Sequence, residues 1–136
     1  MNEHTVLIAD DDEFFSILIE DRLKEEGYRV IVAEDSEELI NHAPSADLLV
    51  VDGRLSEQVF DEQGIKTVVT LCADGKLAPT VPVIFISMFD ENHPLFRNSL
   101  DTLRRMNRSY FWRKRLFLEL DVIVEMIGDL LNGKRV

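Results

Sequence analysis

Short apolar segments, most of them rich in β-branched or aromatic residues, alternate with segments of helical periodicity along nearly the whole chain. The segments predicted as strands are Val6–Ala9, Tyr28–Ala33, Leu48–Val51, Val83–Ile86 and Ser109–Trp112. Nearly continuous apolar runs are typical of strands that are buried on both faces of a parallel sheet. The alternation therefore predicts an α/β fold in which helices cover both faces of one parallel sheet.

Helical spacing and helix-end signals place a helix after each strand. The first helix is indicated by apolar residues at three- and four-residue intervals over 15–23, with Gly27 as a stop signal. In the second, Asp35 is the expected N-cap and Glu38 stands three residues further on. The second helix ends at Pro44, and the others are predicted over Glu62–Ala73, after Pro94 with Leu95, Leu100 and Leu103, and from about Phe117 to Leu131.

Length and charge limit the classes of function. A chain of 136 residues suits one domain, which we expect over residues 5–131, followed by a short tail over 132–136. The net charge of −11 argues against a protein that binds nucleic acid through bulk charge. Cys72 is the single cysteine, so the chain cannot form an internal disulfide. No apolar run reaches the roughly 18 residues of a membrane span, and we expect a cytoplasmic protein with no membrane contact.

The charge is distributed unevenly. Residues 1–96 contain 21 acidic and 6 basic residues, whereas residues 97–115 contain seven basic residues and one acidic residue. Two interpretations of this basic segment remain open: a solvated helix face, or a docking surface for an acidic partner. In the second interpretation, Arg104, Arg105 and Arg108 form the partner face.

Polar residues follow the predicted strands at the point where each strand ends. They are Asp10, Asp11 and Asp12 after the first strand, Asp52 after the third, Ser87 after the fourth, and Arg113 and Lys114 after the fifth. Open parallel sheets bind ligands at the edge where the carboxyl ends of their strands meet. Each residue alone has a structural explanation, such as a helix cap or a turn, but together they indicate one site.

Neighbouring carboxylates repel one another unless a cation offsets their charge. Mg²⁺ suits such an edge, because it binds carboxylate, backbone carbonyl, water and phosphate oxygens. A hydroxyl and an ammonium beside the metal could hold phosphoryl oxygens, and a carboxylate can be the nucleophile that accepts a phosphoryl group. The sequence therefore predicts a Mg²⁺-dependent phosphoryl transfer site.

Three motifs resemble the receiver domain of bacterial two-component response regulators: Val-Leu-Ile-Ala-Asp10-Asp11-Asp12, Leu-Leu-Val-Val-Asp52 and Pro-Val-Ile-Phe-Ile-Ser87. The resemblance covers about residues 5–131. It implies a flavodoxin-like, doubly wound (βα)5 fold, a three-layer sandwich with the strand order 2-1-3-4-5. It also implies that the protein is not a conventional enzyme, since a receiver catalyses only its own phosphorylation and dephosphorylation.

The resemblance also assigns roles to the site residues. Asp52 would accept a phosphoryl group from a sensor histidine kinase or a phosphotransfer protein. Asp10, Asp11 and Asp52, with the backbone carbonyl of Arg54, would bind Mg²⁺, and Ser87 would bind a phosphoryl oxygen. The phosphorylated domain, a monomer or weak dimer, would then bind an output protein.

Two registers remain open at the fifth strand, because the family's usual Lys-Pro pair is absent. If Lys114 is the cation of the site, Phe111 is the switch residue three positions before it. If Arg113 is the cation, Tyr110 is the switch residue. These departures motivate a second hypothesis, a receiver-like interaction module that binds its partner without phosphorylation switching.

Overall fold

The computed structural model describes residues 4–10, 13–52, 63–87, 97–106, 109–113 and 120–133. Within them, strands and helices alternate from one end to the other. In chain order the elements are β1 (Thr5–Ala9), α1 (Glu13–Glu25), β2 (Arg29–Ala33), α2 (Ser36–His42), a 3-10 turn (Ala43–Ser45), β3 (Leu48–Asp52), α3 (Gln63–Ala73), β4 (Val83–Ser87), α4 (Arg97–Met106), β5 (Ser109–Arg113) and α5 (Leu120–Leu131).

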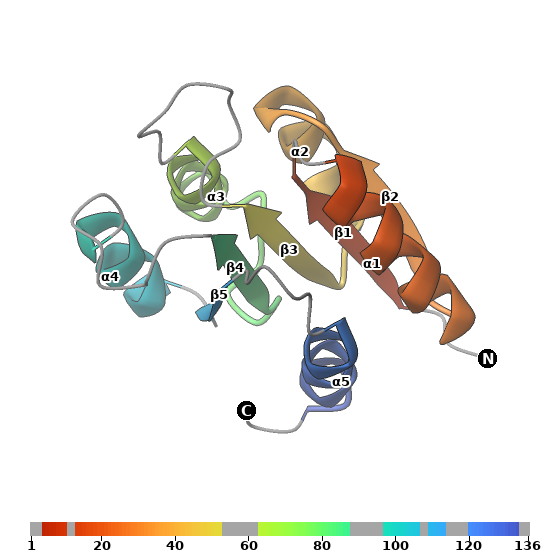
Figure 1. Cartoon of the computed structure of the whole chain (residues 1–136). Coiled ribbons are helices and arrows are strands. Elements are labelled where there is room, and N and C mark those ends of the chain that lie inside the picture. The colour runs from red at the N-terminus through yellow and green to blue at the C-terminus, as the bar shows by residue number, and fades with distance from the viewer. Residues whose placement is uncertain are drawn as a thin grey trace.

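The five strands form one parallel sheet in the order β2-β1-β3-β4-β5 (Figure 1). β1 lies between β2 and β3, so that Ala9 is in register with both Ala33 and Val51. This arrangement confirms the predicted fold class and strand order. Because all strands run in the same direction, their carboxyl ends lie along one edge of the sheet.

Helices cover both faces of the sheet, and each face has its own apolar cluster. Successive strand residues point to opposite faces, so β1, β3 and β4 each contribute to both clusters. The α2–α4 cluster contains Leu7, Ala9, Leu49, Val51, Val83 and Phe85 from the strands and Leu39, Ile65, Val68, Leu71 and Leu100 from the helices. The α1/α5 cluster contains Val6, Ile8, Val50, Ile84 and Ile86 from the strands and Phe15, Ile19, Leu23, Ile123, Val124, Ile127 and Leu130 from the helices.

Local signals placed the helix ends well. Asp35 is the N-cap of α2, as predicted, and its carboxylate accepts a hydrogen bond from the N–H of Glu38. Gly27 has φ 90° just after α1, a left-handed conformation that favours glycine. β2 begins at Arg29, one residue later than predicted. The predicted starts of the last two helices, at 94–95 and 117, lie outside the described residues.

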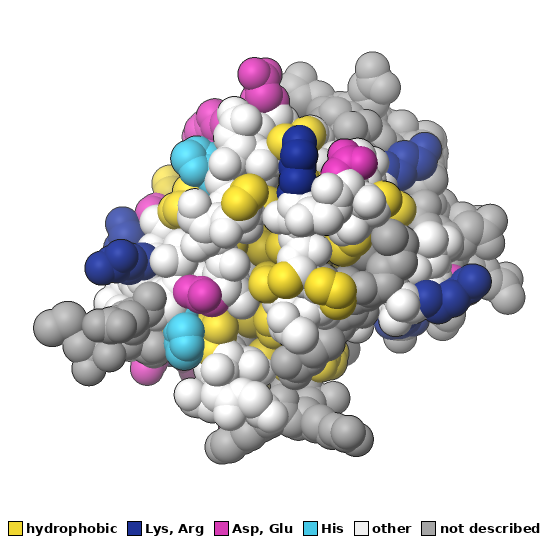
Figure 2. Space-filling model, turned by 180° about the vertical axis from the view of Figure 1, so that it is seen from behind, with side chains coloured by type: hydrophobic (Ala, Val, Ile, Leu, Met, Phe, Trp, Pro, Cys, Tyr) yellow, Lys and Arg dark blue, Asp and Glu magenta, His cyan; other side chains and the backbone are white. Residues whose placement is uncertain are grey.

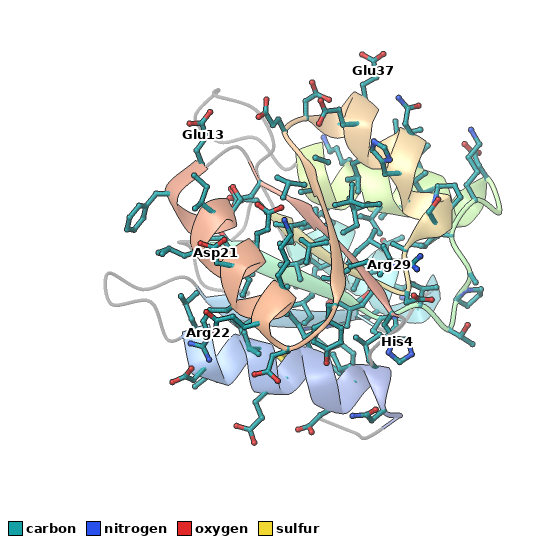
Figure 3. The ribbon with its side chains drawn as sticks, turned by 90° about the vertical axis from the view of Figure 1, so that its right-hand side faces the viewer. His4, Glu13, Asp21, Arg22, Arg29 and Glu37 are labelled. Atoms are coloured by element: carbon teal, nitrogen blue, oxygen red, sulfur yellow. The ribbon has the colours of Figure 1, made fainter. Side chains whose placement is uncertain are left out.

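Contacts between helices join distant parts of the chain. A salt bridge links Arg22 on α1 to Asp121 in the first turn of α5, and Figure 3 shows Arg22 beside that end of α5.

Seen from behind, apolar side chains gather in the middle of the face, with charged side chains around them (Figure 2). Cys72 is half-buried against the α2–α4 cluster.

Candidate functional site

Two buried carboxylates lie at the carboxyl ends of adjacent strands. Asp52 is the last residue of β3 and only 8% exposed, and Asp10, directly after β1, is 1% exposed. The register of Ala9 with Val51 brings positions 10 and 52 next to each other. The N–H of Asp10 donates to the carbonyl of Ala33 at 3.2 Å, which extends the pairing of β1 with β2 by one residue. The sheet therefore fixes the backbone of both aspartates at one edge.

Ser87 lies one strand further along the same edge. It is the last residue of β4 and 2% exposed, and its neighbour Ile86 is in register with Asp52. Ile86 packs in the α1/α5 cluster, so strand alternation directs Ser87 to the α2–α4 side. Ser87 thus ends the strand next to β3 at the same edge of the sheet as the two carboxylates, and strand alternation directs its side chain to the face opposite that of Ile86 and Asp52.

The two candidate switch residues on β5, Tyr110 and Phe111, occupy different register positions. Tyr110 is in register with Ile84 and packs against the α1/α5 cluster, the face opposite to Ser87. Phe111 occupies the next register position, opposite Phe85, and Arg113 is in register with Ser87. Only the backbone positions of Phe111 and Arg113 are described.

Several predicted site residues lie outside the described residues. They are Asp11, Arg54, Arg108 and Lys114. Of the predicted partner face, Arg104 and Arg105 are described, and both are exposed near the carboxyl end of α4.

The donor set at this edge fits a hard divalent cation. Two buried carboxylates on neighbouring strands supply the oxygen ligands that Mg²⁺ prefers, and burial disfavours leaving their charges without a cation. Within the described ranges, no three His, Cys, Asp or Glu side chains are grouped to hold a metal ion. A complete site would therefore draw further ligands from outside those ranges, where Asp11 and Arg54 are located.

Sequence reasoning missed an acidic cavity beside Asp10. Its volume is about 260 Å³, and it is lined by Asp10, Glu13, Ser16, Ile17, Glu20, Val32 and Glu34. Figure 3 shows Glu13 at the start of α1, the end of the helix nearest this edge. The spacing of Glu13, Ser16 and Glu20 along one helix face could have revealed one wall, but the opposite wall comes from β2 and the residue after it.

The comparisons identify the family. The family model of the response regulator receiver domain matches residues 6–102, which include Asp10, Asp52 and Ser87. The chain belongs to the response regulator receiver domain family. Receivers are signalling modules of two-component systems that bind histidine kinases or phosphotransfer proteins and output partners, and they typically use Mg²⁺ for phosphorylation.

Solved structures share the receiver fold. The receiver domain of the Francisella response regulator 1452 is 22% identical, with a TM-score of 0.74, and the match covers 96% of this chain and 98% of that chain. A CheY-like receiver domain protein from Methanospirillum hungatei JF-1 is 21% identical, with a TM-score of 0.73 and coverage of 97% and 96%. A two-component response regulator from Clostridium difficile is 19% identical, with a TM-score of 0.74 and coverage of 96% and 97%.

No curated protein matched the sequence. None of the helices among the described residues has the length and apolar character needed to cross a membrane.

Proposed function

We propose that this receiver accepts a phosphoryl group on Asp52 in a Mg²⁺-dependent reaction and signals by phosphorylation-dependent binding to another protein. The observation that carries the proposal is the pair of buried carboxylates, Asp10 and Asp52, at the carboxyl ends of adjacent strands. Both lie inside the segment that matches the receiver family. The phosphoryl donor would be a sensor histidine kinase or a phosphotransfer protein.

The residues at this edge of the sheet would each have a different role in the reaction. Asp10, Asp11 and Asp52, with the backbone carbonyl of Arg54, would hold Mg²⁺, which offsets negative charge on the phosphoryl oxygens. A carboxylate oxygen of Asp52 forms a bond to phosphorus while the bond from phosphorus to the donor atom breaks and its electron pair leaves with the donor. The hydroxyl of Ser87 would donate a hydrogen bond to a phosphoryl oxygen.

The packing of Tyr110 supports one of the two registers of the fifth strand. A switch residue that responds to Ser87 should lie on the same face of the sheet, but Tyr110 packs against the α1/α5 cluster on the other face. Phe111 stands at the neighbouring register position. This favours Phe111 as the switch residue and Lys114, three positions later, as the cation, because Arg113 would require Tyr110 in the switch role.

The basic segment supports an acidic output partner. Arg104 and Arg105 are exposed near the end of α4, and Arg108 follows them in the sequence. Charged residues at the rim of a protein–protein interface mainly accelerate association and select among partners. Reversing Arg104 and Arg105 to Glu should therefore slow partner association, most clearly at low salt, whereas an unchanged association rate would contradict this partner face.

The proposed function also includes the bounds of the domain, its cellular location and its oligomeric state. The described elements run from Thr5 to Leu131 around one sheet, which supports a single receiver over residues 5–131 with a tail over 132–136. We expect it to act in the cytoplasm as a monomer or weak dimer, and to catalyse only its own phosphorylation and dephosphorylation.

The decisive experiment measures phosphorylation directly. The chain is incubated with Mg²⁺ and acetyl phosphate, and its intact mass is recorded beside that of Asp52→Asn. We expect an added phosphoryl mass in the wild type, none in the variant, and none in either after chelation of Mg²⁺. Phosphorylation of Asp52→Asn to the wild-type extent would show that another residue is the acceptor.

A second candidate function is constitutive binding without phosphorylation switching. The family match ends at residue 102, before β5, so the proposed cation and switch positions lie beyond it. One similar structure, 15% identical, is described as belonging to a family of redox sensors in the streptococci that evolved from two-component response regulators. If Mg²⁺ binds but neither the mass nor the NMR resonances near Ser87 and Arg104 change with acetyl phosphate or beryllofluoride, this candidate becomes the better one.

A further inference from the structure

Gly64, the second residue of α3, lies against the backbone of Asp52. A Cβ atom at position 64 would lie 1.9 Å from the carbonyl oxygen of Asp52 and 3.1 Å from Cγ1 of Val51. Since a Cβ lies about 1.5 Å from its Cα, the Cα of Gly64 is within about 3.4 Å of that oxygen, in the range of a Cα–H···O contact. Position 64 therefore admits only a residue without a side chain, unless the backbone moves.

The contact joins two elements that are each held firmly in the core. Asp52 ends β3, which pairs with β1 and β4, and Figure 1 shows α3 beside the arrowhead of β3. Ile65 and Val68, which follow Gly64 on α3, are fully buried in the α2–α4 cluster. Neither element can move away from the other without loosening that packing.

The orientation of the Asp52 carbonyl is coupled to the direction of its side chain, since both depend on the backbone at the end of β3. We propose that Gly64 is a positioning residue for Asp52, because its lack of a side chain lets the first turn of α3 hold the Asp52 carbonyl in place and so orient the carboxylate. The inference rests on the proposed role of Asp52 as phosphoacceptor. It adds a residue outside the Mg²⁺ and phosphoryl ligands.

The size of the clash sets the expected effect. Real Cβ atoms essentially never approach another heavy atom closer than 3.0 Å, whereas the oxygen lies at 1.9 Å, so Gly64→Ala must displace backbone atoms. The displacement is on the order of 1 Å, and a misplacement of about 1 Å in a reacting group can lower a rate roughly 100-fold. We therefore expect Gly64→Ala to slow phosphorylation of Asp52 at least about tenfold.

Gly128→Ala is the matched control. Gly128 also lies within a helix, α5, and a Cβ there would meet the hydroxyl of Tyr28 at 3.3 Å instead of a backbone atom near Asp52. Both variants and the wild type are phosphorylated with acetyl phosphate and Mg²⁺ under conditions in which circular dichroism shows them folded. The rate constant at saturation and the half-saturating acetyl phosphate concentration are measured per folded molecule.

If Gly64 positions Asp52, its substitution should change the rate constant of phosphorylation but not the binding of acetyl phosphate. Gly64→Ala should lower the rate constant at saturation while the half-saturating concentration changes by less than about twofold, and Gly128→Ala should change neither. A purely structural role would lower stability without lowering the rate per folded molecule. A rate constant for Gly64→Ala within about twofold of the wild type overturns the inference.

NMR separates failure of this inference from failure of the proposed function. If the wild type is not phosphorylated, the proposed function is wrong, and the carbonyl ¹³C resonance of Asp52 then tests the contact alone. A shift in Gly64→Ala but not in Gly128→Ala supports the contact, and no shift overturns it.

If Gly64→Ala does not fold, the wild-type protein provides the test. The two Hα resonances of Gly64 should then be well separated and should move when beryllofluoride is added, while those of Gly128 stay unchanged. Unseparated, unmoved Gly64 resonances overturn the inference.

Discussion

Removal of the Asp35 carboxylate tests how strongly local capping stabilises α2. Oδ1 of Asp35 accepts a hydrogen bond from the N–H of Glu38 at 2.9 Å, and Oε2 of Glu38 accepts one from the N–H of Glu34 at 2.9 Å. The Asp35 side chain therefore accepts a hydrogen bond from a backbone N–H in the first turn of the helix, and the Glu38 side chain accepts one from a backbone N–H just before the helix. Asp35→Ala removes one of these bonds and leaves the other in place.

The expected loss follows from the size and packing of the helix. α2 has only 7 residues, too few to be stable in isolation, and it buries Leu39 completely in the α2–α4 cluster. An N-cap substitution of this kind costs about 0.5–2 kcal/mol, and Asp35 is exposed, so water replaces part of the lost bond. We expect about 1 kcal/mol in the free energy of unfolding, or about 3–5 °C in Tm for a domain of this size.

Urea and thermal denaturation, followed by circular dichroism, measure this loss. Asp35→Asn and Asp35→Ser are the controls, because both retain a side-chain oxygen that can accept the N–H of Glu38. A cycle with Glu38→Ala gives the coupling between the two side chains. If Asp35→Asn is as destabilised as Asp35→Ala, the negative charge and not the hydrogen bond stabilises the helix. If Asp35→Ala unfolds like the wild type, the capping interpretation is wrong.

Three further substitutions test other contacts. Phe85→Ala should cost about 3–5 kcal/mol of unfolding free energy, because Phe85 is fully buried, and a loss below about 1 kcal/mol in urea denaturation would show that its site collapses or is poorly packed. Asp47→Ala removes the 2.7 Å hydrogen bond from the N–H of Thr5 to Oδ2 of Asp47, which should cost about 0.5–1.5 kcal/mol. Hydrogen exchange at the Thr5 amide should accelerate, and unchanged exchange would contradict that bond. Arg22→Ala should cost less than about 1 kcal/mol through its salt bridge to Asp121, because the Asp121 side chain is 83% exposed, so a larger loss in the same denaturation assay would indicate that Arg22 also packs against α5.

Much of the fold could be predicted because its signals are local. Each strand is an apolar run of about five residues, and the ends of β1, β3 and β4 placed Asp10, Asp52 and Ser87 at one edge before any contact was known. The apolar residues of α5 show the limit of such signals: Ile123, Val124, Ile127 and Leu130 are buried in the α1/α5 cluster, whereas Leu120 and Leu131 are only partly buried. Periodicity indicates which face of a helix is apolar, whereas the neighbouring elements decide how wide a stripe is covered.

By itself, the sequence determined the α/β class, the strand order through its resemblance to receivers, the cap of α2 and the strand-end position of the phosphoacceptor candidate. All of these depend on residues within a few positions of one another or on motifs read along the chain. The tertiary structure alone decided that Tyr110 packs on the α1/α5 side, that an acidic cavity adjoins Asp10, and that Gly64 meets the carbonyl of Asp52. Those facts depend on how separate elements are brought together by packing, and neither periodicity nor spacing encodes the distance between atoms on different elements.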